Sequence, residues 1–267
     1  MSYLQKIINL HEAITLAGWN IPAEILNCLS PYEQEFMGIE LTGNRSLTYY
    51  EQRLKNLGFT QLDTVIDAGC GIGQWSIALS KMNWQVKSID INTGRLLVGQ
   101  YLAQAMKVDN IEFQYSSLEN MPFPEQSVDG IFCYGVFMFT QMPIVMKKFS
   151  QVLKPGGRLY LNANSLGWYF HLLLDRGFKQ RNYGLVKTTL RMIFRTITGK
   201  KQNIVVGQKW LRFLLEQHDF SLTEIGPEGS IMIHNEGSLK VIPAYSDSFY
   251  GYPAIIEVLA IKKPRIS

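Results

Sequence analysis

Short apolar runs alternate with longer amphipathic segments through the middle of the chain. The apolar runs have the length of buried strands and lie at 64–68, 85–89, 111–115, 130–134 and 158–162. Helical spacing of apolar residues predicts helices between them, at 73–82, 93–106 and 143–153. Strands separated by helices of this length form right-handed βαβ units. We therefore expect a doubly wound α/β fold with a mostly parallel sheet covered by helices on both faces.

Both ends of the chain depart from this alternation. Helically spaced apolar positions predict helices over residues 4–16 and 47–57, and Pro31 is typical of the first position of another helix. Near the other end, apolar strands at 221–225 and 255–262 are predicted to pair as an antiparallel hairpin at the sheet edge.

These patterns divide the chain into two parts. Residues 1–45 are expected to form a helical cap, and residues 46–267 the main domain. Within that domain, the segment at about 165–206 follows the fifth strand, is helical and basic, and is predicted to be a lid. A helix at 207–218 then leads back to the sheet.

Composition and cysteine spacing exclude several classes of protein. Hydrophobic residues make up 46% and charged residues 18%, which is typical of a chain with a sizeable core and not of a disordered one. Cys28, Cys70 and Cys133 lie far apart, which argues against a disulfide-stapled module and a cysteine-rich zinc site. The start lacks a signal-peptide pattern, and no run of about 18 apolar residues occurs. We expect a cytoplasmic protein.

Charge is distributed unevenly along the chain. Residues 141–215 contain fourteen Lys and Arg and one acid, Asp175, a local charge of +13. Because the whole chain carries +4, the remaining residues carry −9. Such an asymmetry bears on partners and not on the fold.

The sequence VIDAGCGIG joins the first predicted strand to a helix. Its glycines, Gly69, Gly71 and Gly73, would let the backbone pass close to a ligand, and their spacing departs from the G-x-G-x-x-G pattern that binds a pyrophosphate. Asp67, just before them, would repel a pyrophosphate but attract an ammonium group. Asp90 ends the second strand, where a carboxylate can accept hydrogen bonds from ribose hydroxyls. A ribose joined to a charged amino acid describes S-adenosylmethionine better than NAD.

Four segments of the chain, in this order, resemble the class I S-adenosylmethionine-dependent methyltransferases. VIDAGCGIG is similar to the first motif of the family, SIDIN to its ribose motif, SSLENMPFPEQSVDGIF to its third-strand segment, and LKPGGRLY to the turn into its fifth strand. The resemblance covers about residues 62–164. It implies a Rossmann-like, seven-stranded sheet with a terminal antiparallel hairpin, S-adenosylmethionine as cofactor, and transfer of its methyl group by in-line displacement.

The resemblance also assigns cofactor contacts beyond the acids and glycines already named. The amide of Leu118 and the side chain of Ser117 would face the adenine, although the family usually has Asp at the position of Ser117. Ile91 would line the pocket wall. Cys133 lies at the end of the fourth strand, where the methyl group of the family meets its acceptor, and is alternatively a small buried filler.

Two residues are candidates for contact with the methyl acceptor. Tyr134 follows Cys133, and His171 lies just beyond the fifth strand, where the acceptor pocket of the family is lined. A base is needed only for a hydroxyl or protonated amine acceptor, and a single histidine in an apolar helix is often a core residue. No cluster with the spacing of metal ligands occurs, so no metal is expected.

The basic segment contains an amphipathic helix at 184–198. Lys187, Arg191 and Arg195 fall at i, i+4 and i+8 on one face. This face is either the solvated side of a lid or a contact surface for an anionic acceptor, a membrane or nucleic acid.

The leading interpretation is methyl transfer to an oxygen or nitrogen of a small or medium-sized acceptor, with an anionic or lipid-like acceptor as one option. Methylation of RNA is an alternative, because the basic segment suits phosphates. Nucleic acid is less favoured, since the [DNS]-P-P-[YFW] motif of base-amine methyltransferases is replaced by CYGV at 133–136. A non-catalytic protein that binds S-adenosylmethionine is a further alternative.

Overall fold

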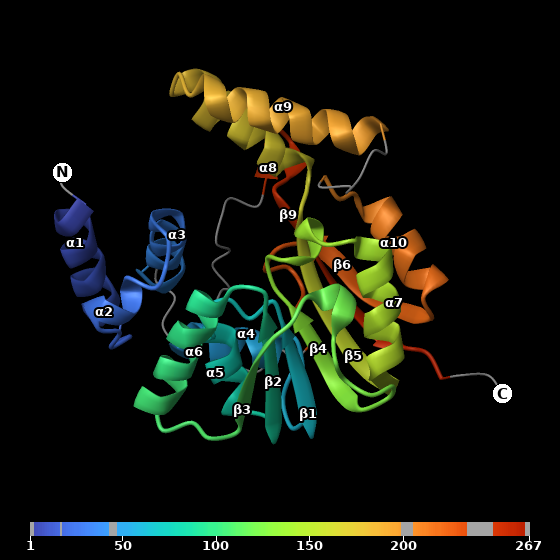
Figure 1. The fold of residues 1–267 in the computed structure, drawn as a ribbon. Coiled ribbons are helices and arrows are strands. Elements are labelled where there is room, and N and C mark those ends of the chain that lie inside the picture. Colours follow the sequence, from blue (N-terminus) through green and yellow to red (C-terminus); the bar gives the residue numbers. More distant parts are fainter. Residues whose placement is uncertain (1–2, 17, 43–46, 199–204, 234–247, 265–267) are drawn as a thin grey trace. The chain divides into compact units, whose positions relative to one another are not determined.

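The computed structural model describes the chain except for residues 1–2, 17, 43–46, 199–204, 234–247 and 265–267 (Figure 1). Its main strands are β1 (Thr64–Ala68), β2 (Gln85–Asp90), β3 (Ile111–Tyr115), β4 (Val128–Cys133), β5 (Leu153–Asn164), β6 (Phe220–Pro227) and β9 (Ile255–Lys262). They form one seven-stranded sheet in the order β3-β2-β1-β4-β5-β9-β6. Strand β9 runs antiparallel to β5 and β6, whereas β1, β2 and β3 pair in parallel, as do β4 and β5. The predicted doubly wound fold with a terminal antiparallel hairpin is confirmed.

The predicted helices are also present, with ends that differ by a few residues. The α-helices are α1 (Tyr3–Leu16), α2 (Ala23–Leu26), α3 (Pro31–Thr42), α4 (Leu47–Asn56), α5 (Gln74–Ser80), α6 (Thr93–Ala105), α7 (Met142–Val152), α8 (Leu166–Phe170), α9 (Tyr183–Thr198) and α10 (Gln208–Gln217). Two short 3₁₀ turns, η1 (Leu118–Asn120) and η2 (Phe137–Phe139), follow β3 and β4. Proline begins α3, as its position in the sequence predicts.

Contacts within the chain define two compact units, and the first comprises residues 1–117 and 233–240. It contains β1–β3, with α5 and α6 packed on these strands, and the helices that precede them (Figure 1). Helix α4 packs against α5 through Tyr50, whose ring lies edge-on to Trp75 at a centroid distance of 4.6 Å and also contacts Trp19. All three rings are buried, so apolar burial fixes α4 to the strand-bearing part of this unit.

The second unit comprises residues 118–232 and 241–267 and contains β4, β5, β6 and β9. Helices α7 and α10 cover these strands through apolar faces, which bury Val145, Phe149, Leu211 and Leu215. Strand β9 is buried almost along its whole length because it lies between β5 and β6. This position explains its nearly continuous apolar sequence.

The sequence KPGG, predicted as a turn before the fifth strand, instead forms a bulge inside β5. Pairing with β4 passes from Val128 opposite Leu153 to Gly130 opposite Arg158, so β5 contains extra residues at this point. Gly156 has φ 80°, a left-handed conformation that suits glycine. The sequence KPGG therefore does change the direction of the backbone, but β5 continues through these four residues.

The segment after β5 is helical, as predicted, but its first helix is not uniform. Helix α8 continues directly into a π-helix (η3, His171–Lys179), a rare form in which the backbone is wound more widely. Helix α9 packs along this π-helix (Figure 1). A small hairpin of β7 (Ser248–Phe249) and β8 (Tyr252–Pro253), which the sequence pattern did not predict, contacts α8.

Candidate functional site

The glycine-rich loop joins the end of β1 to the start of α5. Gly69, Gly71 and Gly73 have φ of 79°, 55° and 81°, a region that residues with a Cβ rarely adopt. A Cβ at Gly73 would lie 3.1 Å from the Cα of Gly99 and 3.2 Å from the ring of Phe113, so this glycine allows α5 to pack closely. A Cβ at Gly71 would meet no atom within 4 Å. The loop therefore exposes its backbone to open space at Gly71.

Asp67 lies near the end of β1 and is 1% exposed. Its carboxylate accepts a hydrogen bond from Ser76 Oγ at 2.6 Å, and Ser76 accepts one from Ser88 Oγ at 2.8 Å. Burial raises the pKa of Asp67 to about 7, the hydrogen bond from Ser76 opposes this rise, and the charge of Asp90 adds to it. An ammonium group beside this carboxyl would favour its ionised form.

Asp90 ends β2, on the strand next to Asp67, and is buried. One carboxylate oxygen accepts a hydrogen bond from Gly71 N at 3.0 Å, and the other accepts one from Asn92 N at 2.8 Å. Each oxygen can still accept a further hydrogen bond, because a carboxylate offers about four lone-pair sites. Asp90 therefore fixes the glycine loop and retains the capacity to bind a diol such as ribose.

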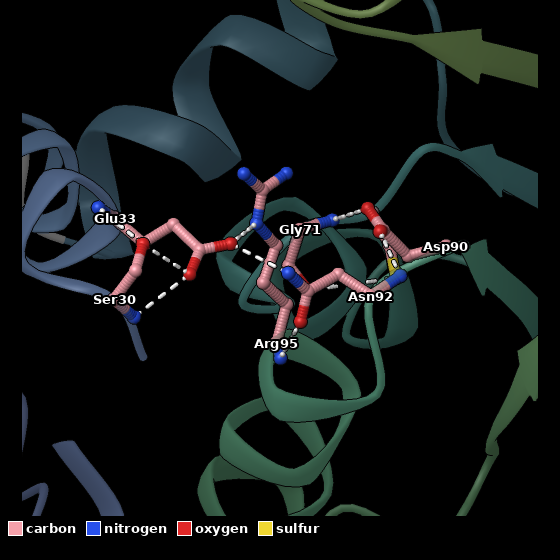
Figure 2. A network of polar contacts seen from close by, with 7 residues as sticks. Ser30, Glu33, Gly71, Asp90, Asn92 and Arg95 are labelled. Atoms are coloured by element: carbon pink, nitrogen blue, oxygen red, sulfur yellow. Dashed lines mark hydrogen bonds and ion pairs between the residues drawn. The ribbon is translucent and has the colours of Figure 1, made fainter. Parts of the chain in front are cut away.

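A polar network leads from Asp90 to the amino-terminal helix α3 (Figure 2). Asn92 caps α6 by accepting a hydrogen bond from Arg95 N at 3.0 Å. Glu33 accepts hydrogen bonds from Asn92 Nδ2 at 2.6 Å and from Arg95 Nε at 2.8 Å. Its other oxygen accepts hydrogen bonds from Ser30 N and Oγ at 2.8 and 2.7 Å, a capping box at the start of α3. These bonds connect α3 to the loop that holds Asp90.

Close backbone packing also joins α6 to the turn that precedes α3. A Cβ at Gly94 would lie 2.4 Å from the carbonyl oxygen of Cys28, so glycine permits direct contact at the first turn of α6.

Burial alone would raise the pKa of Glu33, but the hydrogen bonds from Ser30 and the charge of Arg95 outweigh it and lower the pKa below its ordinary value. Glu33 is thus ionised at neutral pH.

The remaining predicted cofactor residues of the first unit lie beside Asp90. Ile91 follows it and is 66% exposed. Ser117 is half-buried and follows β3, and its neighbour Ser116 donates a backbone hydrogen bond to the carbonyl of Asp90 at 3.1 Å. Asp67, Asp90 and Ser117 therefore come together at the carboxyl ends of three adjacent strands, the edge at which open α/β sheets bind ligands. Leu118, the next residue, is buried in η1.

Two predicted residues lie at the end of β4 in the second unit. Cys133 is fully buried. Tyr134 is half-buried, and its hydroxyl donates a hydrogen bond to Glu228 Oε1 at 2.5 Å. Asn162 of β5 contacts the same oxygen through Nδ2 at 3.4 Å. Sequence reasoning identified Tyr134 but neither Glu228 nor Asn162.

His171, the other acceptor candidate, has a carboxylate partner that the sequence analysis missed. Its Nδ1 lies 3.0 Å from Asp175 Oδ2, one turn further along the π-helix, and its ring stacks on Phe249 at 4.2 Å. Asp175 also accepts hydrogen bonds from Lys179 at 2.6 Å and from Tyr250 at 2.7 Å. Hydrogen bonds from Lys179, Tyr250 and His171 hold the pKa of Asp175 well below its usual range. The contact with Asp175 therefore orients the ring of His171.

The outward face of α9 carries both basic and apolar side chains. Lys187 and Arg191 are exposed, whereas the side chain of Arg195 lies outside the described residues. Three large side chains of the same helix are also exposed: Tyr183 (66%), Leu190 (49%) and Phe194 (65%). The face is thus more apolar than the predicted stripe of charges.

Local signals could have found some of the missed residues. Ser30 and Glu33 have the S-x-x-E spacing of a capping box, and Asp175 is four residues after His171. No local pattern points to Glu228. Among the residues described, no group of three His, Cys, Asp or Glu side chains could hold a metal ion. None of the helices described is long and apolar enough to cross a membrane.

The first unit fits the chemistry of S-adenosylmethionine. Asp67, a buried carboxyl suited to an ammonium group, directly precedes the glycine loop, and Asp90, a carboxylate suited to two hydroxyl groups, accepts a hydrogen bond from Gly71, where the loop faces open space. Asp67 and Asp90 would hold the amino acid and the ribose, respectively. This fit is argued from the two acidic side chains and from the open space at the glycine loop. It does not depend on any similarity of the overall fold to other proteins.

Comparisons with known proteins agree with this chemistry. A protein-family model described as "Methyltransferase domain" matches residues 65–157. A demethylmenaquinone methyltransferase of Geobacillus sp. (strain WCH70) is 24% identical over 127 residues, which are 46% of this chain and 54% of that protein. An uncharacterized methyltransferase, YcgJ of Bacillus subtilis (strain 168), is 32% identical over 98 residues, 36% of this chain and 39% of that protein. The matched region thus spans about half of these relatives or less.

Solved structures show the same fold. The structure of YcgJ has a TM-score of 0.54 at 16% identity and covers 81% of this chain and 99% of that one. Geranyl diphosphate C-methyltransferase from Streptomyces coelicolor A3(2), in complex with Mg²⁺, geranyl diphosphate and S-adenosyl-L-homocysteine, has a TM-score of 0.59 at 15% identity, covering 88% of this chain and 85% of that one. Residues 65–157 therefore match a methyltransferase domain, and the fold of the chain is that of the class I S-adenosylmethionine-dependent methyltransferases.

Proposed function

We propose that the protein transfers the methyl group of S-adenosylmethionine to a small or medium-sized acceptor. The observation that carries this proposal is the convergence of Asp67, Gly71 and Asp90 at the carboxyl ends of β1 and β2. A bound S-adenosylmethionine supplies a methyl group made electrophilic by a positively charged sulfur. The chain positions this group and excludes water, which suffices for an in-line displacement.

Each predicted contact has a role in this proposal. Asp67 pairs with the ammonium group, and Asp90 accepts hydrogen bonds from the ribose hydroxyls. Ser117 and the amide of Leu118 face the adenine, with Ile91 against the pocket wall. Gly69 and Gly73 shape the loop, Gly71 lies closest to the ligand, and Cys133 borders the methyl group.

A lipid-like or anionic acceptor is supported by the relatives and by α9. Demethylmenaquinone and geranyl diphosphate, in the names of two proteins similar to this one, both carry prenyl chains. The exposed face of α9 combines Lys187 and Arg191 with aromatic and aliphatic side chains, a combination that suits an anionic lipid surface. We infer that residues 1–45 act as a helical cap, that the segment 165–206 acts as a lid on the acceptor side, and that the protein works in the cytoplasm.

Labelled methyl transfer tests the proposal and separates it from its alternatives. S-adenosylmethionine with a labelled methyl group is incubated with the protein and a cell extract, which is then separated into small molecules, lipids, RNA and protein. We expect label in the small-molecule or lipid fraction. Label in RNA would support the RNA alternative, and binding without label in any fraction would identify a non-catalytic binder.

The variant Asp90→Ala tests the contact that is proposed with the ribose. Loss of hydrogen bonds to a charged group costs about 1.5–3 kcal/mol, so the affinity for S-adenosylmethionine should fall roughly ten- to a hundredfold. NAD should not bind either protein. Calorimetry that shows equal affinity for both proteins would remove the role assigned to Asp90.

A further inference from the structure

Three polar side chains meet in the second unit at the carboxyl ends of strands that run in the same direction. Tyr134 directly follows β4, Asn162 lies near the end of β5, and Glu228 directly follows β6. The hydroxyl of Tyr134 and the amide of Asn162 both converge on Glu228 Oε1, at 2.5 and 3.4 Å. Ligands of open α/β sheets bind at this edge. The cluster is therefore placed where an acceptor molecule would be held.

The structure keeps this cluster in a fixed geometry. Asn162 is 1% exposed, and its Oδ1 accepts a hydrogen bond from Gly135 N at 2.5 Å. The ring of Tyr134 lies parallel to that of Phe132, with 7° between their planes. Glu228 is only 7% exposed. A buried carboxylate is costly unless polar groups compensate it, and here a phenol and an amide do so.

A second tyrosine–glutamate pair in the same unit is completely buried and serves as a comparison. Tyr160 Oη donates a hydrogen bond to Glu257 Oε2 at 3.0 Å, and Glu257 Oε1 accepts one from Ile231 N at 2.8 Å. Tyr160 is 1% exposed and Glu257 is fully buried. In contrast, Tyr134 is half-buried and lies beyond the end of its strand. Of these two pairs, that of Tyr134 and Glu228 combines a buried carboxylate with a tyrosine that a ligand could reach.

We propose that Tyr134 and Glu228 take the proton of an acceptor hydroxyl group, an inference that rests on the proposed function. As the acceptor oxygen bonds to the transferred methyl group, the electron pair of the broken carbon–sulfur bond stays on sulfur. The proton of the acceptor passes to Tyr134 Oη, and the proton of Tyr134 passes to Glu228 Oε1. Tyr134 is the catalytic residue, and Glu228 is a positioning residue that stores the proton until the product leaves. Asn162 orients Glu228.

Two probes that differ in one atom test this relay. 2-Naphthol is mostly protonated at pH 7.5, whereas 2-naphthalenethiol is mostly ionised and needs no base. Methyl transfer to each probe is measured with the wild type, Tyr134→Phe, Glu228→Gln and the control Tyr160→Phe. Thermal unfolding of all four proteins shows whether a variant is folded.

We expect a loss that depends on the probe. Tyr134→Phe and Glu228→Gln should lower kcat for 2-naphthol by about 10²–10⁴-fold, the usual contribution of a general base, with KM changed by less than about threefold. Their kcat for 2-naphthalenethiol should change by less than about threefold. Tyr160→Phe should keep wild-type values for both probes, even if its stability falls.

A binding measurement tests the relay without turnover. With S-adenosylhomocysteine present, absorbance reports which fraction of bound 2-naphthol is ionised. The wild type should raise this fraction above that of free 2-naphthol at the same pH, and Glu228→Gln should not. Equal losses for both probes, or the same ionised fraction for both proteins, would overturn the proposal.

The outcomes separate this inference from the proposed function. If label from S-adenosylmethionine enters a cell-extract fraction but never 2-naphthol, the inferred hydroxyl acceptor is wrong and the proposed function stands. If no fraction and neither probe is labelled, the proposed function itself is wrong.

Discussion

At the scale of single residues, Asp67 is a buried carboxyl whose ionised form is unfavourable without a cation and can bind a cation that enters the glycine loop. It is almost fully buried, and its carboxylate accepts a hydrogen bond from Ser76 Oγ at 2.6 Å. Burial and the charge of Asp90 make the ionised form unfavourable, so the pKa rises to about 7 despite the bond from Ser76. A cation brought into the loop would remove that penalty.

We predict that cofactor binding depends on pH through Asp67. Below pH 7 the carboxyl is mostly protonated and must lose a proton before it pairs with an ammonium group. For a pKa near 7, the ionised fraction, and with it the affinity for S-adenosylmethionine, should rise roughly eightfold between pH 6 and 7.5. Asp67→Asn should bind more weakly and show no such rise. Calorimetry at four pH values measures this, and a parallel dependence in both proteins would contradict the assignment.

Stability without cofactor should show the opposite trend. Because the pKa of Asp67 in the folded protein exceeds the usual 3.8, the folded state binds more protons between about pH 4 and 7. The contribution of Asp67 to the free energy of unfolding therefore falls as pH rises through this window. Asp67→Asn should be stabilised relative to wild type at pH 8 and much less so at pH 4, as measured by urea unfolding.

Gly71 is predicted to be needed for binding and not only for backbone conformation. Ala at a left-handed position costs about 1–2 kcal/mol, so Gly71→Ala and the control Gly156→Ala should both lower stability by that amount. A Cβ meets no atom within 4 Å at either position. Only Gly71→Ala should weaken S-adenosylmethionine binding, by about tenfold, because its methyl group occupies ligand space. Equal affinities of the two variants would show that the loop does not contact the cofactor.

At the scale of elements, helix caps join the amino-terminal helices to the cofactor loop. Glu33 completes the capping box of α3, and Asn92 caps α6. The same two side chains bond to each other, and Asn92 N bonds to Asp90. A capping side chain usually accepts a hydrogen bond from a backbone N–H group at the end of a single helix. Here they also fix the position of α3 against α6.

We predict that Glu33→Gln destabilises the protein by about 1–2 kcal/mol at pH 7, because a charged acceptor of several hydrogen bonds is lost. The pKa of Glu33 is lowered below its usual 4.5, so its contribution is present above that pH and is lost as pH falls through the lowered value. The difference from wild type should therefore shrink near pH 3. Exposed Glu35, on the same helix, provides the control Glu35→Gln. Matching denaturation midpoints for the two variants at pH 7 would refute the role of Glu33.

At the scale of the whole molecule, the charge asymmetry of the sequence has a structural counterpart. The +13 segment includes α9, whose exposed face carries Lys187 and Arg191 beside uncovered aromatic side chains. Like charges four residues apart cost an isolated helix about 0.2–0.5 kcal/mol per pair. A surface that attracts anions would compensate for this cost.

We predict that replacing Lys187, Arg191 and Arg195 by Gln weakens binding to vesicles that contain anionic phospholipid. Each basic residue near such a surface contributes about 1 kcal/mol, so the partition coefficient should fall at least tenfold at low salt. The difference should shrink at high salt because the charges are screened. Affinity for S-adenosylmethionine should not change. Identical vesicle binding at both salt concentrations would mean that this face is only solvated.

The sequence by itself determined the elements and the cofactor loop of this protein. Strand β1 was predicted with its final bounds, and the ends of α6 and α7 differed by one residue, because local periodicity and turn residues define these elements. The glycines and Asp67 lie within seven residues of one another, so a local pattern could reveal them. Asp90 ends the adjacent strand, and the rule for parallel strands places both acids at one edge.

Only the tertiary structure decided which distant residues became partners. Tyr134 and Glu228 are 94 residues apart, and Glu33 and Arg95 are 62 apart, separations that no local pattern spans. The π-helix also went unrecognised, because its sequence has the same apolar spacing as an ordinary helix. Periodicity records which face of an element is buried, whereas the choice of partner depends on how the elements pack. That packing placed the buried carboxylate of Glu228 beside the hydroxyl group of Tyr134, which the sequence had identified only as a candidate for contact with the acceptor.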